Sequence, residues 1–501
     1  KLLVEEMENI LEKSTNQGSE RAIQRHFKRG QLLARERVEL LLDDDAPFLE
    51  LLPLVGYEQD GMTLGGSSVA GIGLVCGVEC MISANVPTLK GGSINESSLI
   101  KGARLAEIAW ENHLPVINLI QTGGADLSQQ AKVFHRGGAS FRNLAQRSKE
   151  GLPTIAVVFG SSTAGGAYSP GMSDYTIMVK DHAKVFLGGP PLVKMATGEE
   201  VDAESLGGAE MHSKLSGVSD YLALDEYQAI ERARHVLASL HWKKKTPLPK
   251  DHLGQSSSTS TSYNAHFQRV EQPRYPISDL MGIVPCNIRK PFDAHEVIAR
   301  LVDGSRMSLF KPMYGVNLVC CWAKIDAIPI AIIANNGVIF PEEANKGTQF
   351  IQLSNQKSTP LIFLQNITGF MVGKKYEQEG IIKAGARFIN AVSNSQVPAI
   401  TIVMGASYGA GNYAMCGRAY KPRFLFSWPN SKCSVMGPEQ LTGVLDIVMR
   451  AAAKRRGIEL DEQFAKQRKD MFQKQVEQQS HVYYTSSRAI DDGVIHPCHT
   501  R

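Results

Sequence analysis

Gly160-Ser-Ser-Thr-Ala-Gly-Gly-Ala-Tyr-Ser-Pro170 follows directly on the apolar run Thr154-Ile-Ala-Val-Val-Phe159. That run is rich in β-branched residues and short enough to be a buried strand. Paired glycines after a buried strand allow a tight turn and leave its backbone N–H groups uncovered by side chains. At the start of a helix, such groups can stabilise a negatively charged oxygen. Taken alone, the stretch favours a plain tight turn over a functional site.

The second half of the chain carries the same pattern, in Gly405-Ala-Ser-Tyr-Gly-Ala-Gly-Asn-Tyr413. An offset of 245 residues places residues of the first half on like residues of the second: Lys101-Gly102 on Lys346-Gly347, Pro115 on Pro360, Gly124 on Gly369, Pro153 on Pro398, Gly160 on Gly405, Ser162 on Ser407, Gly166 on Gly411 and Tyr168 on Tyr413. Ala84-Asn85 matches Ala334-Asn335 at an offset of 250, which indicates a five-residue length difference between the copies. The sequence therefore predicts a tandem duplication of one unit, with an anion-stabilising turn in each copy.

Short apolar runs alternate with amphipathic stretches in both halves, and this alternation predicts an α/β fold with two homologous domains. We expect strands at 71–75, 80–85, 115–120 and 154–159, and helical structure at 1–45, 98–112 and 461–479. A chain of 501 residues is too long for one core. Residues 241–275 are rich in lysine, serine and proline and too poor in apolar residues to fold alone. The expected organisation is an N-terminal domain at 1–245, a linker at 246–275 and a C-terminal domain at 276–501.

Composition argues against several functional classes. The formal net charge of +4 is small for this length and gives no sign of a nucleic-acid partner. The eight cysteines include no C-x-x-C pair, which favours reduced, mostly buried thiols and no metal site. No apolar run reaches the length of a membrane span, so no membrane association is expected.

Two anion-stabilising turns suit a reaction in which negative charge develops on two partners, such as a thioester enolate and the urea oxygen of biotin. A rival explanation is a serine hydrolase, because Gly405-Ala-Ser-Tyr-Gly409 fits the G-x-S-x-G pattern of a nucleophile elbow. Ser407 would then be the nucleophile of an esterase or thioesterase, with Asp446 and either His481 or His496 following in hydrolase order. The elbow pattern is absent from the equivalent stretch of the first half, and a hydrolase does not explain the duplication.

Several further motifs are distinctive in combination: Gly30-Gln-Leu-Leu-Ala-Arg-Glu-Arg37, Thr163-Ala-Gly-Gly-Ala-Tyr168, Gly188-Gly-Pro-Pro-Leu-Val-Lys194, Ala196-Thr-Gly-Glu199, Leu206-Gly-Gly-Ala209, Asn366-Ile-Thr-Gly-Phe370, Gly409-Ala-Gly-Asn-Tyr413 and Asp491-Asp-Gly-Val494. With them the chain resembles the carboxyltransferase (beta) subunit of biotin-dependent acyl-CoA carboxylases, from about Gly30 to Arg501. The resemblance implies two tandem copies of a crotonase-like unit, a β-β-α spiral.

The resemblance also implies roles for residues. The N–H groups of Gly165 and Gly166 would hold the enolate oxygen of the acyl-CoA, and those of Ala410 and Gly411 the ureido oxygen of carboxybiotin. The substrate enolate would then attack the carbon dioxide released from carboxybiotin. Further residues expected to contact substrate or cofactor are Ala164, Ala167, Tyr168, Gly123, Gly124, Asn335, Asn336, Gly337, Lys346, Gly347, Gly369, Phe370 and Tyr413. Lys346, considered without the resemblance, is equally well a surface residue of a helix.

The segment Ser407–Tyr413 followed by Cys416-Gly-Arg-Ala-Tyr420 resembles the methylcrotonyl-CoA and geranyl-CoA branch of this family. We therefore expect 3-methylcrotonyl-CoA or a related branched enoyl-CoA as substrate. Phe134–Arg147 is shorter than the same segment of typical methylcrotonyl-CoA enzymes and lacks their aromatic pair. A missing aromatic wall would admit a longer chain, so geranyl-CoA or a long-chain acyl-CoA is the alternative.

The sequence contains no Met-Lys-Met biotin-attachment motif. Biotin is therefore expected on a separate alpha subunit that also makes carboxybiotin, and no metal is expected in this chain. The resemblance implies a homo-hexamer within a hetero-oligomer, with each site between the N-domain of one subunit and the C-domain of another. It implies the cytoplasm in a bacterium and the mitochondrial matrix in a eukaryote. A CoA-binding scaffold without catalysis is a third, non-enzymatic possibility.

Overall fold

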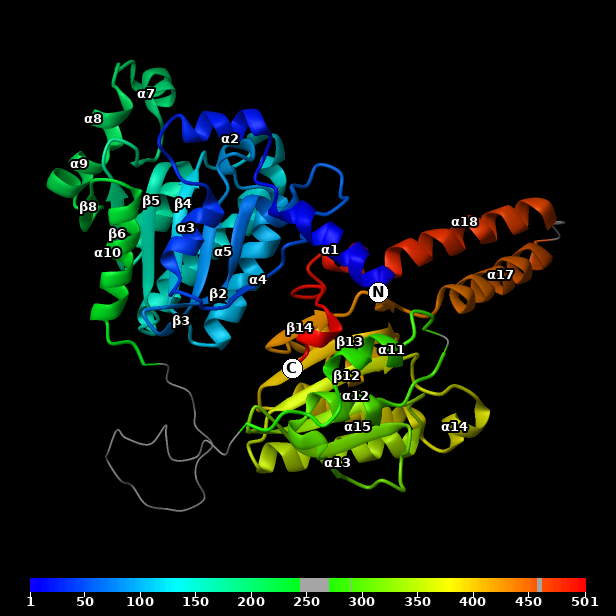
Figure 1. The fold of residues 1–501 in the computed structure, drawn as a ribbon. Helices are drawn as coiled ribbons and strands as arrows, with labels where there is room; N and C mark the ends of the chain where they lie inside the picture. The colour runs from blue at the N-terminus through cyan, green and yellow to red at the C-terminus, as the bar shows by residue number, and fades with distance from the viewer. Residues whose placement is uncertain (244–269, 289, 457–461) are drawn as a thin grey trace. The chain divides into compact units, whose positions relative to one another are not determined.

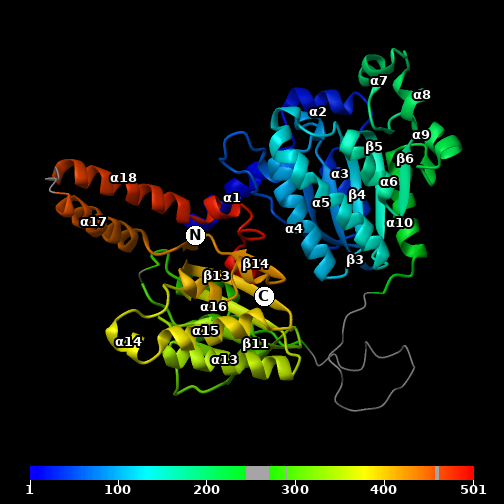
Figure 2. The same ribbon diagram turned by 180° about the vertical axis from the view of Figure 1, so that it is seen from behind.

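The computed structural model describes residues 1–243, 270–288, 290–456 and 462–501. It divides into two compact units, each built on its own sheet (Figure 1, Figure 2). The N-terminal unit contains Asn9–Thr246 and Ser487–Ala489, and the C-terminal unit contains Lys1–Glu8, Pro247–Ser486 and Ile490–Arg501. Most of the expected linker, 246–275, lies outside the described residues.

The N-terminal unit has an eight-stranded sheet within the described part of the chain: β1 (Phe48–Glu50), β2 (Ser68–Val75), β3 (Val78–Asn85), β4 (Val116–Thr122), β5 (Thr154–Thr163), β6 (Tyr175–Val179), β7 (Lys184–Phe186) and β8 (Tyr221–Ala223). Its order is β1-β2-β3-β4-β5-β6-β8, and β7 also pairs with β5. β2 and β3 form an antiparallel hairpin, whereas the neighbours from β3 to β8 are parallel. Because carboxyl ends of parallel strands meet at one edge, the turns after β4 and β5 are neighbours there.

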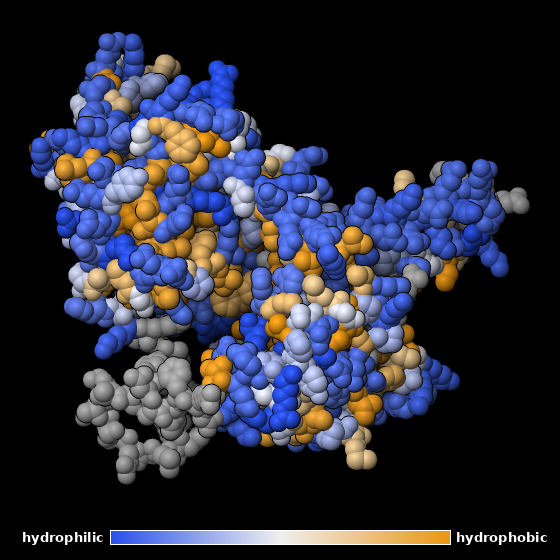
Figure 3. All heavy atoms as spheres, in the orientation of Figure 1, coloured by the Kyte–Doolittle hydropathy of each residue, from blue (hydrophilic) through white to orange (hydrophobic). Residues whose placement is uncertain are grey.

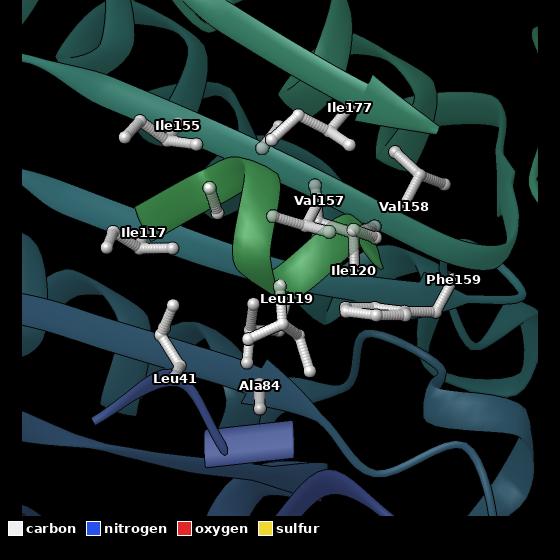
Figure 4. Close-up of a cluster of buried hydrophobic side chains, with 14 of the residues drawn as sticks. Leu41, Ala84, Ile117, Leu119, Ile120, Ile155, Val157, Val158, Phe159 and Ile177 are labelled. Atoms are coloured by element: carbon white, nitrogen blue, oxygen red, sulfur yellow. The ribbon is translucent and has the colours of Figure 1, made fainter. Parts of the chain in front are cut away.

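One face of this sheet packs against α3 (Ala34–Leu41) and α10 (Glu226–Ser239), and this layer is the hydrophobic core of the unit. Figure 4 shows side chains of α3 and of strands β3 to β6 gathered in this cluster, among them Ile117, Leu119 and Val157. Strand side chains alternate between faces. Asn118, between Ile117 and Leu119, therefore points to the other face, which α4 (Glu96–Glu111) and α5 (Gln130–Lys149) cover.

The C-terminal unit repeats this arrangement with a seven-stranded sheet in its described residues: β9 (Ser308–Leu309), β10 (Leu318–Ile325), β11 (Ile328–Asn335), β12 (Leu361–Ile367), β13 (Ala399–Tyr408), β14 (Phe424–Ser427) and β15 (Lys432–Ser434). The order is β14-β13-β12-β11-β10-β9, and β15 pairs with β13. α11 (Leu280–Ile283) and α12 (Ala294–Leu301) pack on one face, and α13 (Pro341–Gln356) and α15 (Ile381–Ser393) pack on the other.

The remaining helices are short or peripheral: α1 (Leu2–Thr15), α2 (Glu20–Phe27), α6 (Tyr168–Met172), α7 (Pro190–Thr197), α8 (Ala203–Gly207), α9 (Ala209–Met211), α14 (Lys374–Gln378), α16 (Ala410–Ala414), α17 (Pro438–Arg455), α18 (Glu462–Ser480) and α19 (Val482–Ser486). Short helical turns complete the chain: η1 (Leu64–Ser67), η2 (Lys90–Gly92), η3 (Leu127–Gln129), η4 (Ala164–Ala167), η5 (His212–Ser216), η6 (Ile277–Asp279), η7 (Asp303–Ser305), η8 (Arg418–Tyr420) and η9 (Pro497–His499).

The two units agree in register at the 245-residue offset, which confirms the predicted duplication. Thr122 pairs with Ser162 after an irregularity in β4, and Ile367 pairs with Ser407 after the same irregularity in β12. Isolated bridges join Ile94 to Ala125 in one unit and Ile339 to Phe370 in the other. The helices α4 and α13 also begin alike. In each, the side chain at the third helical position accepts a hydrogen bond from the backbone N–H of the N-cap residue. The chain is thus an α/β protein of two related units.

Several element boundaries differ from the expectations. β5 does not end at Phe159 but continues to Thr163, because Ser161–Thr163 pair with β7. The helical region 1–45 is three separate helices, and the last of them ends at Leu41. The expected terminal helix at 461–479 corresponds to α18, whose described residues begin at Glu462.

The surface drawn in Figure 3 is mostly hydrophilic, with hydrophobic side chains in scattered patches. Some large exposed apolar side chains lie together on α17: Val444, Leu445, Ile447 and Val448. Within the ranges that the structure describes, no helix combines the length and the apolar character needed to cross a bilayer.

Candidate active site

The turn after β5 presents backbone donors at the start of a helix. Ala164 has a φ of 54°, the left-handed region, and this reverses the chain into η4. Gly165 and Gly166 follow, at the helix start, where N–H groups lack a partner within the helix. The Ser162 hydroxyl donates to the Gly166 carbonyl at 2.9 Å and so holds the turn closed. Ala164 and Gly165 are exposed, whereas Gly166 and Ala167 are buried.

The neighbouring turn after β4 packs directly against this one. Gly124 has a φ of 90°, and a Cβ on it would lie 2.9 Å from the Thr163 carbonyl oxygen, so only glycine fits without a shift. A Cβ on Gly166 would in turn lie 2.9 Å from Cγ2 of Thr122. The N–H of Gly123 donates to the Gly91 carbonyl at 3.0 Å. The structure therefore brings Gly123, Gly124, Gly165 and Gly166 together at one edge of the sheet.

The C-terminal unit has the equivalent turn after β13. Gly409 has a φ of 59°, the counterpart of Ala164, and α16 begins at the next residue. The first N–H groups of α16 belong to Ala410, which is exposed, and Gly411, which is buried. A Cβ on Gly411 would lie 2.6 Å from Ile367 and 3.2 Å from Cα of Gly369. Gly369 and Gly411 are therefore neighbours, in the same way as Gly124 and Gly166 of the N-terminal unit.

Aromatic rings flank both turns. Tyr168 is 46% exposed and meets the edge of Phe141 with ring centroids 5.3 Å apart. Tyr413, its counterpart, is also 46% exposed and lies 5.8 Å from the Tyr420 ring. Phe370 packs instead on α15, because a Cβ on Gly385 would lie 3.1 Å from its ring. The two tyrosines are placed beside the open donors, whereas Phe370 is half-buried, packs against the core and lines a cavity.

Ser407 is built into the fold rather than presented as a nucleophile. It is fully buried in β13, where its hydroxyl donates to Oε1 of Gln365 at 2.6 Å and accepts from Nδ2 of Asn412 at 2.7 Å. Nε2 of Gln365 donates in turn to the Met415 carbonyl at 2.6 Å. This network fixes α16 and its first N–H groups. No histidine hydrogen-bonds to Ser407 among the described residues, so the geometry gives the hydrolase explanation no base.

The segment expected to bind acyl-CoA, from Asn335 to Gly347, makes structural contacts inside the C-terminal unit. Oδ1 of Asn335 accepts from the N–H of Asn366 at 3.2 Å, and Oδ1 of Asn336 accepts from the N–H of Ala294 at 2.8 Å. Lys346 is 2% exposed and donates to the Gly315 carbonyl at 3.1 Å, so it is not a surface residue. Asn317 packs closely against Gly337, and Phe388 packs closely against Gly347, where a Cβ would clash with each side chain. The buried Nδ2 of Asn335 has no partner among the described residues.

The turn of the N-terminal unit borders a cavity, and a second cavity lies beside Gly369 in the C-terminal unit. A cavity of about 360 Å³ begins at Gly165 and Gly166 and runs between the sheet and helices α4 and α5. A cavity of about 520 Å³ borders Gly369 and Phe370 and extends to the start of α17 at Pro438. Both volumes fall in the range of small-molecule sites. Within the described residues no group of three His, Cys, Asp or Glu side chains is placed to hold a metal ion.

Comparison with known proteins decides the family. The model of the carboxyl transferase domain matches residues 25–501. The chain belongs to the carboxyl transferase family. This carboxyltransferase is 53% identical over 499 residues to the probable biotin-dependent acyl-coenzyme A carboxylase beta2 subunit of Mycobacterium tuberculosis, covering 99% of this chain and 91% of that one. It is 48% identical over 504 residues to the probable mitochondrial methylcrotonoyl-CoA carboxylase beta chain of Drosophila melanogaster, covering 100% and 87% of the two chains.

A solved structure agrees with the fold. The beta subunit of geranyl-CoA carboxylase from P. aeruginosa superimposes with a TM-score of 0.87 at 41% identity, covering 99% of this chain and 88% of that one. The carboxyltransferase is accordingly the beta-type subunit of a biotin-dependent acyl-CoA carboxylase, with a duplicated crotonase-like fold. Dependence on biotin implies a biotin-carrying partner subunit.

Residues of the segment 134–147, expected from the sequence to form the wall of the substrate pocket, line the cavity of the N-terminal unit, whereas the contribution of β4 was not expected. Asn118 on β4 and Asn143 and Arg147 on α5 belong to this lining. A signal was available, because the 245-residue offset places these three residues on Phe363, Phe388 and Val392. Where one unit has polar residues at positions that the other unit fills with core residues, the space between the sheet and its outer helices is not filled by the protein itself.

Proposed function

We propose that the chain transfers the carboxyl group of carboxybiotin, presented by a biotin-carrying alpha subunit, to the enolate of an acyl-CoA. The observation that carries this proposal is the pair of equivalent turns. Each turn has a left-handed residue, Ala164 or Gly409, followed by helix-initial N–H groups. Such donors are fixed in advance and aimed at developing negative charge, which is the largest single catalytic contribution in many acyl-transfer enzymes.

The surroundings of the two turns support a different role for each of them. The N–H groups of Gly165 and Gly166 open beside the cavity along α4 and α5, so they are assigned to the thioester enolate. The N–H groups of Ala410 and Gly411 lie near the wider cavity at Gly369, so they are assigned to the ureido oxygen of biotin. Carboxybiotin, when presented there, would supply the carbon dioxide. Tyr168 and Tyr413 are proposed contacts at the rims, and Ala164, Ala167, Gly123 and Gly124 shape the acyl side.

Substrates related to 3-methylcrotonyl-CoA are favoured by the relatives, several of which are methylcrotonoyl-CoA carboxylase beta chains. A longer acyl chain is the second candidate. It is favoured by the depth of the cavity behind Gly166, which extends along β4 as far as Val116. The geranyl-CoA carboxylase structure, which matches this chain over nearly its whole length, is consistent with that alternative.

The proposed assembly is a homo-hexamer joined to alpha subunits. The exposed apolar side chains of α17 support its burial against another subunit, since contiguous exposed apolar residues mark interaction surfaces. Relatives occur in a bacterium and in mitochondria. The proposed location is accordingly the cytoplasm of a bacterium or the mitochondrial matrix of a eukaryote.

Reconstitution tests the proposal. The chain is mixed with a biotinylated alpha subunit, ATP and bicarbonate, and supplied in turn with 3-methylcrotonyl-CoA, geranyl-CoA and saturated acyl-CoA of increasing length. Incorporation of labelled bicarbonate into at least one acyl-CoA is expected. Tight binding of CoA with no carboxylation of any member of the panel would instead favour a CoA-binding scaffold without catalysis.

A further inference from the structure

The strands that lead into the two turns, 164–166 and 409–411, each contain a bulge at the same place. In β5, the three residues 159–161 lie opposite Gln121 alone, and in β13 the three residues 404–406 lie opposite Asn366 alone. At the bulge the strand also changes neighbour, because β5 passes from β6 to β7 and β13 passes from β14 to β15. A bulge bends its strand and so sets the direction of the residues that follow it.

The first carbonyl of the bulge in the N-terminal unit is bound by a side-chain amide. Nε2 of Gln31 donates to the Phe159 carbonyl at 3.1 Å, and Gln31 is 5% exposed. Oε1 of Gln31 accepts from Nε2 of Gln121, the residue opposite the bulge, at 3.3 Å. The Phe159 ring packs in the hydrophobic cluster of this unit (Figure 4). A single glutamine thus connects the two strands at the bulge.

The equivalent carbonyl of the C-terminal unit is bound by an amide from elsewhere in the chain. Met404 is the counterpart of Phe159 at the 245-residue offset, and its carbonyl accepts from Nδ2 of Asn430 at 2.9 Å. Asn430 is half-buried in the turn between β14 and β15. The loop between β6 and β7 of the N-terminal unit, 180–183, contains no amide side chain. The two copies therefore form the same hydrogen bond with amides at non-equivalent positions.

Two amides of separate origin at one position indicate that the bulge itself requires the donor. A bulged residue departs from regular ladder pairing, and a buried carbonyl without a donor costs free energy. Phe159 and Met404 precede Gly165 and Ala410, the first proposed oxyanion donors, by six residues each. A change at the bulge therefore reaches those N–H groups through a short length of strand. A displacement of about 1 Å in a positioned group can cost about 100-fold in rate.

We propose that Gln31 and Asn430 are positioning residues for the two turns. Each amide holds the bulge in the conformation that aims the N–H groups of the following turn, Gln31 in the N-terminal unit and Asn430 in the C-terminal unit. The inference rests on the proposed function, because it takes those N–H groups to hold the enolate and ureido oxygens. Neither side chain lines the cavity described for its unit, so each acts through the backbone.

Gln31→Met, which removes the amide at nearly constant volume, tests the N-terminal turn in the reconstituted complex. The kcat for carboxylation of acyl-CoA is expected to fall by about tenfold or more, while KM for acyl-CoA changes by less than about twofold, because the enolate charge develops only in the transition state. Decarboxylation of carboxybiotin without acyl-CoA should keep its wild-type rate. Gln17→Met is the matched control and should keep the wild-type kcat, since Gln17 is a buried glutamine of the same unit that accepts from the N–H of Arg35 and does not contact the bulge.

Asn430→Leu tests the C-terminal turn independently. It should lower carboxybiotin decarboxylation and carboxyl transfer together, by about tenfold, because both steps need the ureido oxyanion. Asn355→Leu is its control and should lower neither rate per folded molecule. Asn355 is likewise half-buried, and its Nδ2 donates to the Ile351 carbonyl within α13.

Rates are expressed per folded molecule, with the folded fraction measured by circular dichroism, so that a loss of stability alone leaves kcat unchanged. A wild-type kcat in Gln31→Met would overturn the inference, and so would an equal loss of decarboxylation and transfer in that variant, or an equal loss of kcat in Gln17→Met. If Gln31→Met fails to fold, Gln31→Glu takes its place, because an ionised carboxylate cannot donate to the Phe159 carbonyl. Failure of the wild type to carboxylate any acyl-CoA refutes the proposed function, whereas an active wild type with an unaffected Gln31→Met refutes only this inference.

Discussion

The two units share a backbone plan but fill the layer between sheet and outer helices in opposite ways. In the C-terminal unit, Phe350, Phe363 and Phe388 are fully buried there. Their counterparts in the N-terminal unit are Leu105, Asn118 and Asn143, which line a cavity. β5 and β13 are each followed by a residue of positive φ, Ala164 or Gly409, and then by helix-initial N–H groups, so both copies present backbone donors at the same place. If the two turns have the roles proposed above, the residues packed around a turn decide which partner it binds.

The largest effect is expected from removing a ring of the filled layer. Phe388→Ala is predicted to lower the free energy of unfolding by about 3–5 kcal/mol, because it deletes a fully buried aromatic side chain and leaves a void. Asn143→Ala, at the equivalent position, is predicted to cost less than about 1 kcal/mol, since that side chain already borders empty space. Urea denaturation of both variants measures the contrast. Similar losses would show that the two layers are packed alike.

The second comparison separates the two turns by the catalytic step proposed for each. Gly166→Ala places a Cβ 2.9 Å from Thr122, and Gly411→Ala places one 2.6 Å from Ile367, so both substitutions displace their N–H donors. Each is expected to reduce carboxyl transfer by about 100-fold. Gly411→Ala should also impair decarboxylation of carboxybiotin measured without acyl-CoA, whereas Gly166→Ala should spare it.

Gly165→Ala serves as a milder companion to these variants. A Cβ at that position meets nothing closer than Phe141 at 3.9 Å, so the loss of activity should be smaller than for Gly166→Ala. Loss of decarboxylation in Gly166→Ala would contradict the assignment of the two turns.

The smallest effect concerns two equivalent buried lysines. Nζ of Lys101 donates to the carbonyls of Gly65 and Ser68 at 3.1 and 2.8 Å, whereas Nζ of Lys346 donates to that of Gly315 at 3.1 Å. Lys101→Met is expected to cost about 1–3 kcal/mol at pH 7, because two carbonyls lose a donor and only that of Gly65 keeps a backbone N–H, from Ser68. Lys346→Met is expected to cost less, because the Gly315 carbonyl keeps the N–H of Leu318. Denaturation of both variants at the same pH measures the two losses of unfolding free energy. A larger loss for Lys346→Met would contradict the comparison.

The same lysine gives a pH dependence of defined sign. Burial lowers the pKa of Lys101 from its ordinary value near 10.5 to about 8. Between those two values the unfolded chain binds more protons than the native state, so native stability rises with pH in that window. The difference in unfolding free energy between wild type and Lys101→Met should therefore grow from pH 8 toward pH 10. A difference that stays flat or shrinks would show that Lys101 keeps its proton.

The backbone plan could be predicted from the sequence because it depends on residue types with strong local preferences. Glycines and prolines recur at the 245-residue offset, and they mark turns wherever they occur. The pairing of Ser162 with Thr122 and of Ser407 with Ile367 follows the same offset. The extension of β5 to Thr163 was missed, because it depends on pairing with β7, a partner more than twenty residues away.

The cavity and the burial of Lys346 could not be predicted in the same way. A cavity is an absence of volume, and no local pattern around Asn118 or Asn143 indicates that their facing positions are empty. Lys346 lies on an amphipathic helix, where a lysine is usually solvated. Its burial depends on the Gly315 carbonyl, which reaches it from a distant loop. Comparison of the two copies exposes the cavity, whereas the two equivalent lysines are buried alike.

The unfilled layer also has a consequence for motion. On α5, twenty residues long, only Val133 and Arg147 are buried, whereas the shorter α15 buries Ile381, Ala384, Gly385, Phe388 and Val392. A helix with so few buried contacts opens locally at a small fraction of the free energy of global unfolding. An acyl chain bound in the cavity of the N-terminal unit, as proposed, would supply the missing apolar contacts along its inner face. Ordering of α5 and occupancy of that cavity would then be thermodynamically linked, and the affinity for substrate would include the free energy of ordering that helix.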